Sequence, residues 1–141
     1  FGCVRTDLLP PLPGEPTGHV DMFLTFTAPG ELIVGSYRFD DAPEPRQHLD
    51  AIAFYLAQRG YRVRRVPMPS QIDGFYRTYT NSVAVNGVVL MPYYESDSST
   101  LQEALQVFQL AYPERTIVPI ESSALIKLDG AVHCAAMTLS R

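Results

Sequence analysis

The sequence predicts an α/β fold that is built from a repeated strand-strand-helix-strand unit. Residues 19–26 alternate between apolar and polar side chains, which is the two-residue period of a half-buried strand. Apolar residues at helical spacing follow over 49–56, and a strand-like run covers 61–66. The same order of patterns recurs over 81–120. This internal repeat is the observation that most strongly indicates the architecture.

The first unit is expected to run from a hairpin through a helix to a third strand. An Ala-Pro-Gly turn at 28–30 leads into a second strand at 32–37. A Pro-Glu-Pro segment at 43–45 suits a helix start, because proline is tolerated in the first helical turn. Gly60 stands where a helix C-cap glycine is expected, and the strand at 61–66 completes the unit.

The second unit repeats this order. An Asn-Gly pair at 86–87 is a strong two-residue hairpin turn and joins predicted strands at 81–85 and 88–93. Thr100 begins a Thr-x-x-Glu capping box at the start of an amphipathic helix. A strand at 116–120 completes the unit.

Equivalent positions relate the units to one another. Leu49 of the first helix corresponds to Leu101 of the second, and Val66 corresponds to Val118. A third unit is predicted to open as a strand at 132–138. The chain therefore holds about two and a half units, and units of this size usually stack or close around an axis.

Composition excludes several classes of protein. The 141 residues are 46% hydrophobic and 18% charged, whereas a disordered chain is poor in apolar residues and rich in charge. The net charge of -4 comes without a basic patch, so we expect no nucleic-acid partner. No apolar run approaches the ~20 residues of a membrane span, so we expect no membrane partner. Cys3 and Cys134 are too few for a disulfide framework or a thiolate zinc site.

Residues 1–16 are expected to form a proline-rich connector ahead of the repeated modules at 17–141. Its four prolines disfavour both helix and strand. The chain begins at Phe1 rather than at methionine, and no signal-peptide pattern is present. We therefore expect part of a longer protein. Both a cytoplasmic and a secreted location of the protein stay open, and the cytoplasm is slightly favoured.

Polar side chains interrupt the first strand of each unit, and these positions form the candidate site. His19 and Asp21 are two residues apart, so they would share one face of the first strand. Asn81 opens the first strand of the second unit, and Cys134 occupies that of the third. If rotation about an axis relates the units, a histidine, a carboxylate, an amide and a thiol converge on it.

Plainer interpretations and a metal site stay open at this point. A His-x-Asp pair on a strand is more often a surface hydrogen-bonded pair, and a lone cysteine in an apolar strand is usually a small core residue. Asn81 could merely begin its strand. Zinc ligands could come from His19, Asp21, His133 and Cys134. Since His133 and Cys134 are adjacent on the predicted strand, they would point to opposite faces, and at most three ligands would converge.

Three short motifs carry the candidate side chains along residues 17–134. The first is Thr-Gly-His-Val-Asp-Met-Phe at 17–23. The second combines Tyr-Thr-Asn-Ser at 79–82 with Val-Asn-Gly at 85–87, and the third is Gly-Ala-Val-His-Cys at 130–134. Together they resemble the bacterial, Porphyromonas-type peptidylarginine deiminase family. Agmatine deiminases are its close relatives within the guanidino-group-modifying superfamily.

Two features make the chain more similar to the peptidylarginine deiminase branch. The tract Tyr-Arg-Thr-Tyr-Thr-Asn at 76–81 looks closer to that branch. Agmatine deiminases typically carry a Gly-Gly pair and a Gln-Gln pair around the final cysteine. Here Gly-Ala stands at 130–131 and Met-Thr at 137–138.

The resemblance implies a pentein-like, five-bladed α/β propeller. This chain would then hold about two and a half of the five modules and would be the C-terminal part of the protein. The N-terminal modules, with a second guanidinium-binding aspartate, would lie outside it. We therefore expect the chain to associate with that missing half or with itself.

The resemblance also implies catalytic roles for His19, Asp21, Asn81 and Cys134. Asp21 would bind the substrate guanidinium, and Cys134 would attack its carbon as a thiolate. His19 would transfer protons, and Asn81 would orient the thiol or the substrate. His133 would point away from Cys134 and be structural. No metal and no organic cofactor is implied.

The expected function is that of a guanidino deiminase. It would hydrolyse an arginine-like substrate, either peptidyl or free arginine, to a citrulline-like product and ammonia. An agmatine deiminase that makes N-carbamoylputrescine is the alternative enzyme, and a non-catalytic guanidino-binding fragment is the alternative outside enzymes. Arg38 and Arg77 could meet a substrate carboxylate, although we expect both to lie on the solvated surface, as we do for His48.

Overall fold

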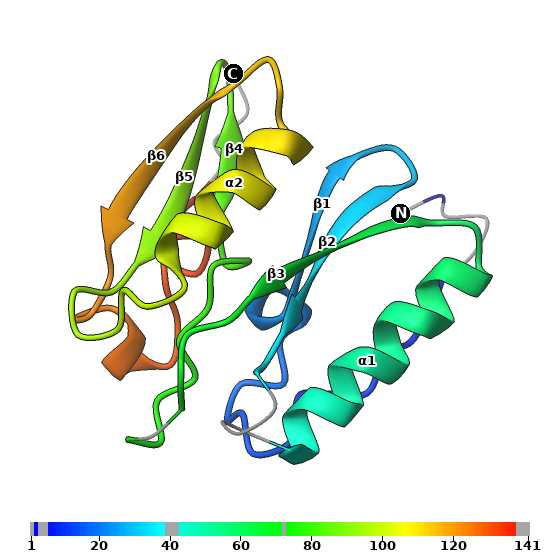
Figure 1. Ribbon diagram of the computed structural model, residues 1–141, viewed down its shortest axis with the longest axis horizontal. Coiled ribbons are helices and arrows are strands. Elements are labelled where there is room, and N and C mark those ends of the chain that lie inside the picture. The colour runs from blue at the N-terminus through cyan, green and yellow to red at the C-terminus, as the bar shows by residue number, and fades with distance from the viewer. Residues whose placement is uncertain (1, 3–5, 39–42, 72, 138–141) are drawn as a thin grey trace.

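The computed structural model describes residues 2, 6–38, 43–71 and 73–137, and it contains two α/β units of the same topology (Figure 1). The first unit consists of β1 (Leu24–Ala28), β2 (Glu31–Ser36), α1 (Pro43–Gln58) and β3 (Arg62–Pro67). The second consists of β4 (Val83–Val85), β5 (Val88–Tyr93), α2 (Leu101–Ala111) and β6 (Thr116–Glu121). Two short 3-10 helices are η1 (Val20–Met22) and η2 (Ile126–Leu128).

The two sheets have the same strand order and the same pairing. β1 is antiparallel to β2, and β2 is parallel to β3. β4, β5 and β6 repeat this arrangement. Parallel neighbours need a crossover connection, which α1 and α2 supply. The predicted repeat of strand, strand, helix and strand is therefore confirmed.

One apolar core joins the two units. α1 packs on β2 and β3, whereas α2 packs on β6 of its own unit and on β3 of the other (Figure 1). Leu56 of α1 and Phe108 of α2 are both buried in this core. Each such side chain contributes about 1.5–3 kcal/mol by leaving water. Because α2 bridges the units, it fixes how the loops of one unit face those of the other.

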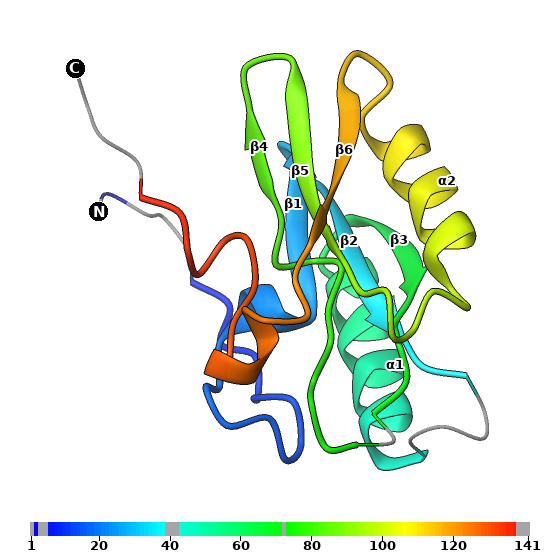
Figure 2. The same ribbon diagram turned by 90° about the vertical axis from the view of Figure 1, so that its left-hand side faces the viewer.

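Both short helices lie at the same end of the molecule (Figure 2). Met22 of η1 and Ile126 of η2 pack together with Tyr94 in a small buried cluster. This cluster holds the segment before β1 against the segment after β6. In the part of the chain that the structure describes, no helix is both long and apolar enough to cross a bilayer.

The capping box predicted at the start of α2 is wrong. Thr100 is the N-cap residue, but its side chain makes no capping hydrogen bond. Its hydroxyl instead lies 3.0 Å from the hydroxyl of Tyr79, and both residues are buried. A buried phenol hydroxyl needs a hydrogen-bond partner. The Thr100 hydroxyl serves as that partner and therefore does not cap the helix.

The proline-rich segment packs on the core. As predicted, residues 6–16 contain no helix and no strand. Leu12, however, is 2% exposed and belongs to the main cluster, and the Tyr76 hydroxyl donates to the Pro13 carbonyl at 2.8 Å. The boundary placed at residue 16 stays a prediction.

The structure corrects the start of each predicted first strand. Residues 20–22 form η1, in which the Met22 amide donates a hydrogen bond to the His19 carbonyl and the Phe23 amide to the Val20 carbonyl. β1 therefore begins only at residue 24. β4 likewise begins after Asn81, at residue 83.

The strand predicted at 132–138 is also wrong. Residues 132–135 form a turn, and residue 138 lies outside the described residues. In the η1 segment local hydrogen bonds occupy the backbone groups that a strand would offer to a neighbour. In the turn, the amides of Ala131, His133 and Cys134 bond to Asn81 instead.

Candidate active site

Glu15 shapes the loop that presents His19. Its buried carboxylate accepts hydrogen bonds from the Thr17 amide at 3.0 Å, the Thr17 hydroxyl at 2.8 Å and the Gly18 amide at 2.8 Å. The Thr17 hydroxyl in turn accepts the His19 amide at 3.1 Å. Gly18 has a φ of 67°, a conformation that favours glycine. Sequence reasoning missed Glu15, although a carboxylate two residues before a Thr-Gly pair is a signal for such a loop.

A buried hydroxyl network ties η1 to the segment before β4. The Thr80 hydroxyl donates to the Asp21 carbonyl at 3.0 Å and lies 2.9 Å from the Thr78 hydroxyl. The Tyr94 hydroxyl accepts the Thr78 amide at 3.1 Å and donates to the Thr78 carbonyl at 3.0 Å. Burial raises the pKa of Tyr94, so this phenol stays a neutral donor.

Asn81 connects the parts of the candidate site. Its Nδ2 donates to Asp21 Oδ2 at 2.8 Å and to Cys134 Sγ at 3.1 Å. Its Oδ1 accepts the amides of Ala131, His133 and Cys134 at 3.1, 3.0 and 3.2 Å. The residue is 0% exposed. One buried amide therefore fixes the carboxylate, the thiol and the turn that carries the thiol.

The same turn requires Gly130. A Cβ at this position would lie 2.6 Å from the Cβ of Cys134 and 3.0 Å from its Sγ. Both distances are shorter than nonbonded carbon and sulfur atoms tolerate. The absence of a side chain at Gly130 thus lets Cys134 approach the backbone closely.

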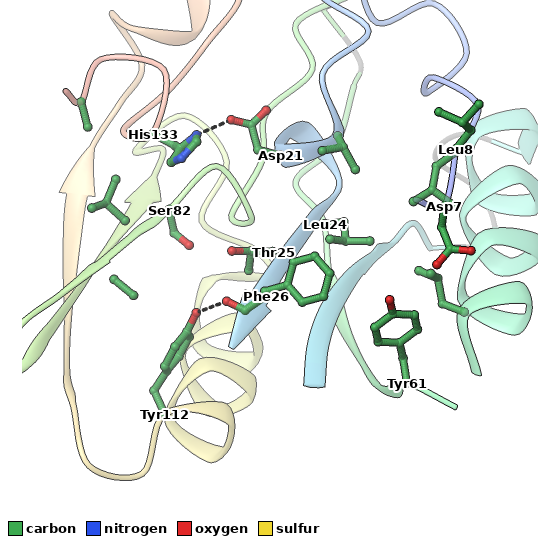
Figure 3. Close-up of a pocket in the computed structure, with 16 residues that line it drawn as sticks. Asp7, Leu8, Asp21, Leu24, Thr25, Phe26, Tyr61, Ser82, Tyr112 and His133 are labelled. Atoms are coloured by element: carbon green, nitrogen blue, oxygen red, sulfur yellow. Dashed lines mark hydrogen bonds and ion pairs between the residues drawn. The ribbon is translucent and has the colours of Figure 1, made fainter. Parts of the chain in front are cut away.

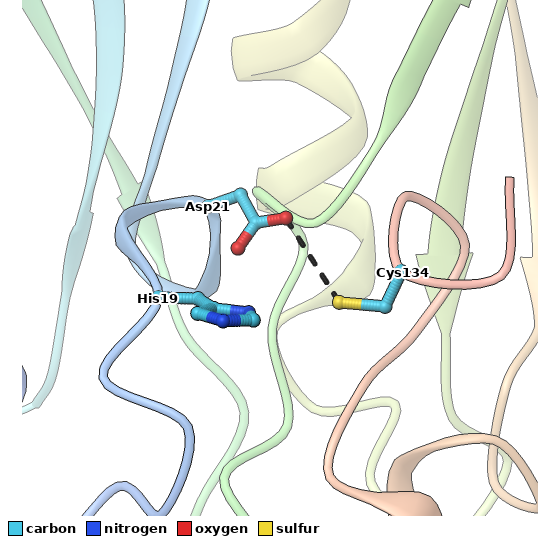
Figure 4. Close-up of side chains that lie close together, drawn as sticks. All are labelled: His19, Asp21 and Cys134. Carbon is cyan, nitrogen blue, oxygen red and sulfur yellow. Dashed lines mark hydrogen bonds between the residues drawn. The ribbon is translucent and has the colours of Figure 1, made fainter. Parts of the chain in front are cut away.

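His19, Asp21 and Cys134 converge from two separate segments (Figure 4). One ligand-capable atom from each lies within 4.8 Å of the other two, and Cys134 Sγ lies 3.9 Å from Asp21 Oδ2. His19 and Cys134 are exposed, whereas Asp21 is half-buried. Together with Asn81, these are the four side chains that the sequence singled out. The structure brings them together by way of a 3-10 helix, a bend and a turn rather than by strand pairing.

His133, expected to point away from Cys134 and to be structural, contacts the candidate site. Its Nδ1 lies 2.5 Å from Asp21 Oδ2 (Figure 3). The same oxygen faces Cys134. Adjacent side chains point to opposite faces only on a strand, and this segment is a turn. His133 is thus a member of the site that sequence reasoning placed outside it.

The site opens onto a groove of about 760 Å³ between the N-terminal segment, β1 and the start of β4 (Figure 3). Asp21, His133 and Ser82 line it together with largely apolar residues. Among these, Phe26 is 59% exposed and Val20 is 47% exposed. The catalytic candidates therefore lie beside an uncovered apolar surface.

Arg77 is buried, contrary to the expected solvated role. Its guanidinium donates to both oxygens of Asp73 at 2.7 and 2.6 Å and lies over the Tyr94 ring. These bonds lower the pKa of Asp73 to about 2. Arg38 is exposed, as expected, and His48 is half-buried.

The family model described as Porphyromonas-type peptidyl-arginine deiminase matches residues 8–139. This chain belongs to that family. The resemblance carried by the three motifs is thereby confirmed over nearly the whole sequence.

Solved structures of this kind share the fold. A Porphyromonas gingivalis protein provisionally named arginine deiminase superposes with a TM-score of 0.78 at 27% identity, over 92% of this chain and 40% of that one. Enterococcus faecalis agmatine deiminase gives a TM-score of 0.73 at 22% identity, over 88% of this chain and 41% of that one. The partial, pentein-like α/β fold is confirmed.

Curated relatives of the family are longer than this chain. A Streptomyces coelicolor protein provisionally named agmatine deiminase is 27% identical over 127 residues, which are 83% of this chain and 37% of that protein. Agmatine deiminase of Pseudomonas fluorescens Pf-5 is 22% identical, over 85% of this chain and 39% of its own. The chain thus spans about two fifths of the length of these relatives.

Proposed function

We propose that the protein carrying this chain is a guanidino deiminase in which Cys134 is the nucleophile. The observation that supports this most directly is the Asn81 amide, which holds the Asp21 carboxylate and the Cys134 thiol next to each other. A carboxylate beside a nucleophile is what the chemistry needs. A guanidinium is cationic, planar and a poor electrophile, and it must be held by hydrogen bonds while it is attacked.

Asp21 is the proposed guanidinium ligand. Its Oδ2 already accepts hydrogen bonds from Asn81 and His133, so the carboxylate is fixed in rotation. Its Oδ1 is buried and has no hydrogen-bond partner among the described residues. A guanidinium N–H directed at Oδ1, which points to the side of the His19 ring (Figure 4), would satisfy this oxygen.

The proposed reaction proceeds through a covalent intermediate. The Cys134 thiolate adds to the guanidinium carbon to give a tetrahedral adduct. His19 then donates a proton to one amino group, which leaves as ammonia while the C–N bond breaks and a thiouronium-type intermediate forms. His19 next accepts a proton from water as the water oxygen attacks the same carbon. The C–S bond breaks to release the thiolate, the hydroxyl proton of the adduct passes to solvent, and the neutral ureido product is released.

An arginine-like substrate, peptidyl or free, fits the motifs of the chain best. Agmatine is a second candidate, because Enterococcus faecalis and Pseudomonas fluorescens relatives are named agmatine deiminases. Both substrates carry the same reacting group and differ at the far end. The contacts that distinguish them are expected to come from outside this chain.

A substrate panel on the complete protein tests this proposal. Ammonia and ureido product are measured with free arginine, a peptidyl arginine and agmatine. We expect turnover of at least one, its loss by several orders of magnitude in Cys134→Ser, and near-normal turnover in Cys3→Ser. The substrate with the highest kcat/KM identifies the class. Full turnover by the Cys134→Ser protein would overturn the covalent mechanism.

A further inference from the structure

We infer that His19, Asp21 and Cys134 bind a thiophilic divalent cation, for which zinc is the best fit. The binding itself follows from the donor set in this chain. Its inhibitory consequence rests on the proposed function.

The donor atoms match zinc in kind. A thiolate, an imidazole nitrogen and a carboxylate oxygen are its three common protein ligands, and three protein ligands with one open position are typical of accessible sites. Purely oxygen-binding cations such as calcium and magnesium would gain nothing from Cys134 or His19.

The donor atoms also match zinc in spacing. Metal–ligand distances of about 2.0–2.3 Å in a tetrahedral shell put donor atoms roughly 3–4 Å apart. Cys134 Sγ already lies 3.9 Å from Asp21 Oδ2, and no pair in the set of three exceeds 4.8 Å. The side chains of His19 and Cys134 are exposed, so both have room on the solvent side to turn toward a shared ion.

Asp21 supplies an independent indication of a cation. Its Oδ1 is buried and receives no hydrogen bond from any described residue. In Figure 4 this oxygen points to the side of the His19 ring, while Oδ2 faces Cys134. A carboxylate oxygen that is cut off from water and lacks a donor is costly, and a bound cation would remove this cost.

The surroundings support such a site. Asn81 Nδ2 and His133 Nδ1 both hold Asp21 Oδ2, and the same Asn81 nitrogen contacts Cys134 Sγ. Partners of this kind orient metal ligands and raise affinity. Because His19 and Cys134 are exposed, the cation can enter from solvent and keep a water molecule in its fourth position.

Zinc binding and guanidino chemistry exclude each other. When the S–Zn bond forms, Cys134 loses its thiol proton to solvent, and no electron is transferred. The cation then occupies the thiolate and the carboxylate that a guanidinium would need. Zinc therefore inhibits the enzyme reversibly and shields Cys134 from modification.

Cobalt(II) is the spectroscopic probe for the 141-residue chain. A thiolate bound to Co²⁺ gives a sulfur-to-cobalt charge-transfer band in the near ultraviolet, and Zn²⁺ displaces it. We expect one equivalent to saturate the band, Cys134→Ser to abolish it, and Cys3→Ser to retain it. His19→Ala and Asp21→Asn should weaken Zn²⁺ binding by roughly tenfold or more, whereas His48→Ala should leave it unchanged.

Alkylation of the unmutated chain tests the same site without depending on whether the variants fold. One equivalent of Zn²⁺ should slow the reaction of iodoacetamide with Cys134 by about tenfold or more, and leave that of Cys3 unchanged, as measured by mass spectrometry. Equal rates with and without Zn²⁺, or a cobalt band that survives in Cys134→Ser, would overturn the inference. Zinc binding without loss of ammonia release by the complete protein would support the metal site and contradict the proposed role of Cys134.

Discussion

Asn81 uses both ends of a buried amide, and the two ends have opposite hydrogen-bonding character. Its Nδ2 donates to a carboxylate and a thiol, and its Oδ1 accepts three amides of the turn. No other side chain of similar shape offers both. The residue therefore links the positions of Asp21 and Cys134 to each other.

Asn81→Asp keeps the shape but replaces the donor with an oxygen next to the Asp21 carboxylate. We expect a loss of about 1–3 kcal/mol in the free energy of unfolding and a fall in kcat/KM of the complete protein of about a hundredfold or more. Urea unfolding and ammonia release measure the two effects. Asn86→Asp, in the β4–β5 turn, is the matched control and should change neither. A fully active Asn81→Asp protein would show that the bridge is dispensable.

A substitution at Gly130 tests whether Cys134 must approach the backbone closely. Gly130→Ala places a Cβ against the Cβ and Sγ of Cys134 and should displace the thiol. We expect kcat to fall by about tenfold or more, because small misplacements of a nucleophile are costly. Gly87→Ala is the control, since a Cβ there meets nothing within 4 Å. Equal turnover of the two variants would contradict the geometry of the turn.

The sequence located the residues of the candidate site better than it located their surroundings. His19, Asp21, Asn81 and Cys134 were predictable because each stands at an equivalent place in a repeat and within a family motif. Glu15 and His133 were not, because both act from a loop or a turn. At His133 the period-two pattern treats the turn as a strand and gives its side chains the wrong directions, whereas Glu15 lies in a segment interpreted only as a connector.

At the scale of elements, the prediction succeeded where patterns are long. Periodicity and turn residues indicated α1, α2 and the two hairpins, as well as a third strand after each helix. Short segments at strand ends were mistaken, because tertiary hydrogen bonds decide them. The Thr100 hydroxyl bonds to Tyr79 rather than to its helix, and the amides of residues 131–134 bond to Asn81. These hydrogen-bond partners lie far away in the sequence, so no local sequence pattern reveals them.

The Asp73–Arg77 ion pair braces the segment that leads to Asn81, and it predicts a pH dependence. Arg77 lowers the pKa of Asp73 to about 2. A carboxyl whose folded pKa is depressed adds stability above its unfolded pKa of about 4, and this contribution is lost as pH falls through about 2. Asp73→Asn should therefore be less stable at pH 7, and its stability should fall less than that of the wild type between pH 5 and pH 2.

Urea unfolding at several pH values measures this difference. Glu114→Gln, at an exposed carboxylate, is the control and should follow the wild-type curve. Because the Asp73 side chain is 48% exposed, the effect is expected to be small. Identical pH curves for Asp73→Asn and the wild type would mean that the ion pair adds nothing to stability.

At the scale of the whole molecule, the described residues form two complete α/β units beside an uncovered apolar groove. Leu8, Val20 and Phe26 line this groove and are 87%, 47% and 59% exposed. The relatives are more than twice as long as the chain, which covers 37–41% of those compared above. We propose that the remaining modules of the family cover this surface in the complete protein.

The isolated chain is therefore expected to have no deiminase activity. Asp21 is the only acidic residue that the family motifs supply here, and an open site lacks the low-dielectric surroundings in which fixed charges act most strongly. Ammonia and ureido product are measured for the chain alone and after addition of the N-terminal half in trans. Turnover by the chain alone at the rate of the intact protein would refute the idea that essential groups lie outside it.

In the proposed reaction, Asp21 binds an amidinium-like cation while Cys134 attacks its carbon. Chloroacetamidine and the neutral chloroacetamide differ in charge but hardly in size, and both alkylate a thiolate with loss of chloride. The two rates at Cys134 are measured by mass spectrometry on the complete protein, in the wild type and in Asp21→Asn. We expect the cationic reagent to label Cys134 much faster than the neutral one in the wild type, and Asp21→Asn to abolish this preference. Equal rates for the two reagents in the wild type, or a preference that survives in Asp21→Asn, would contradict the account.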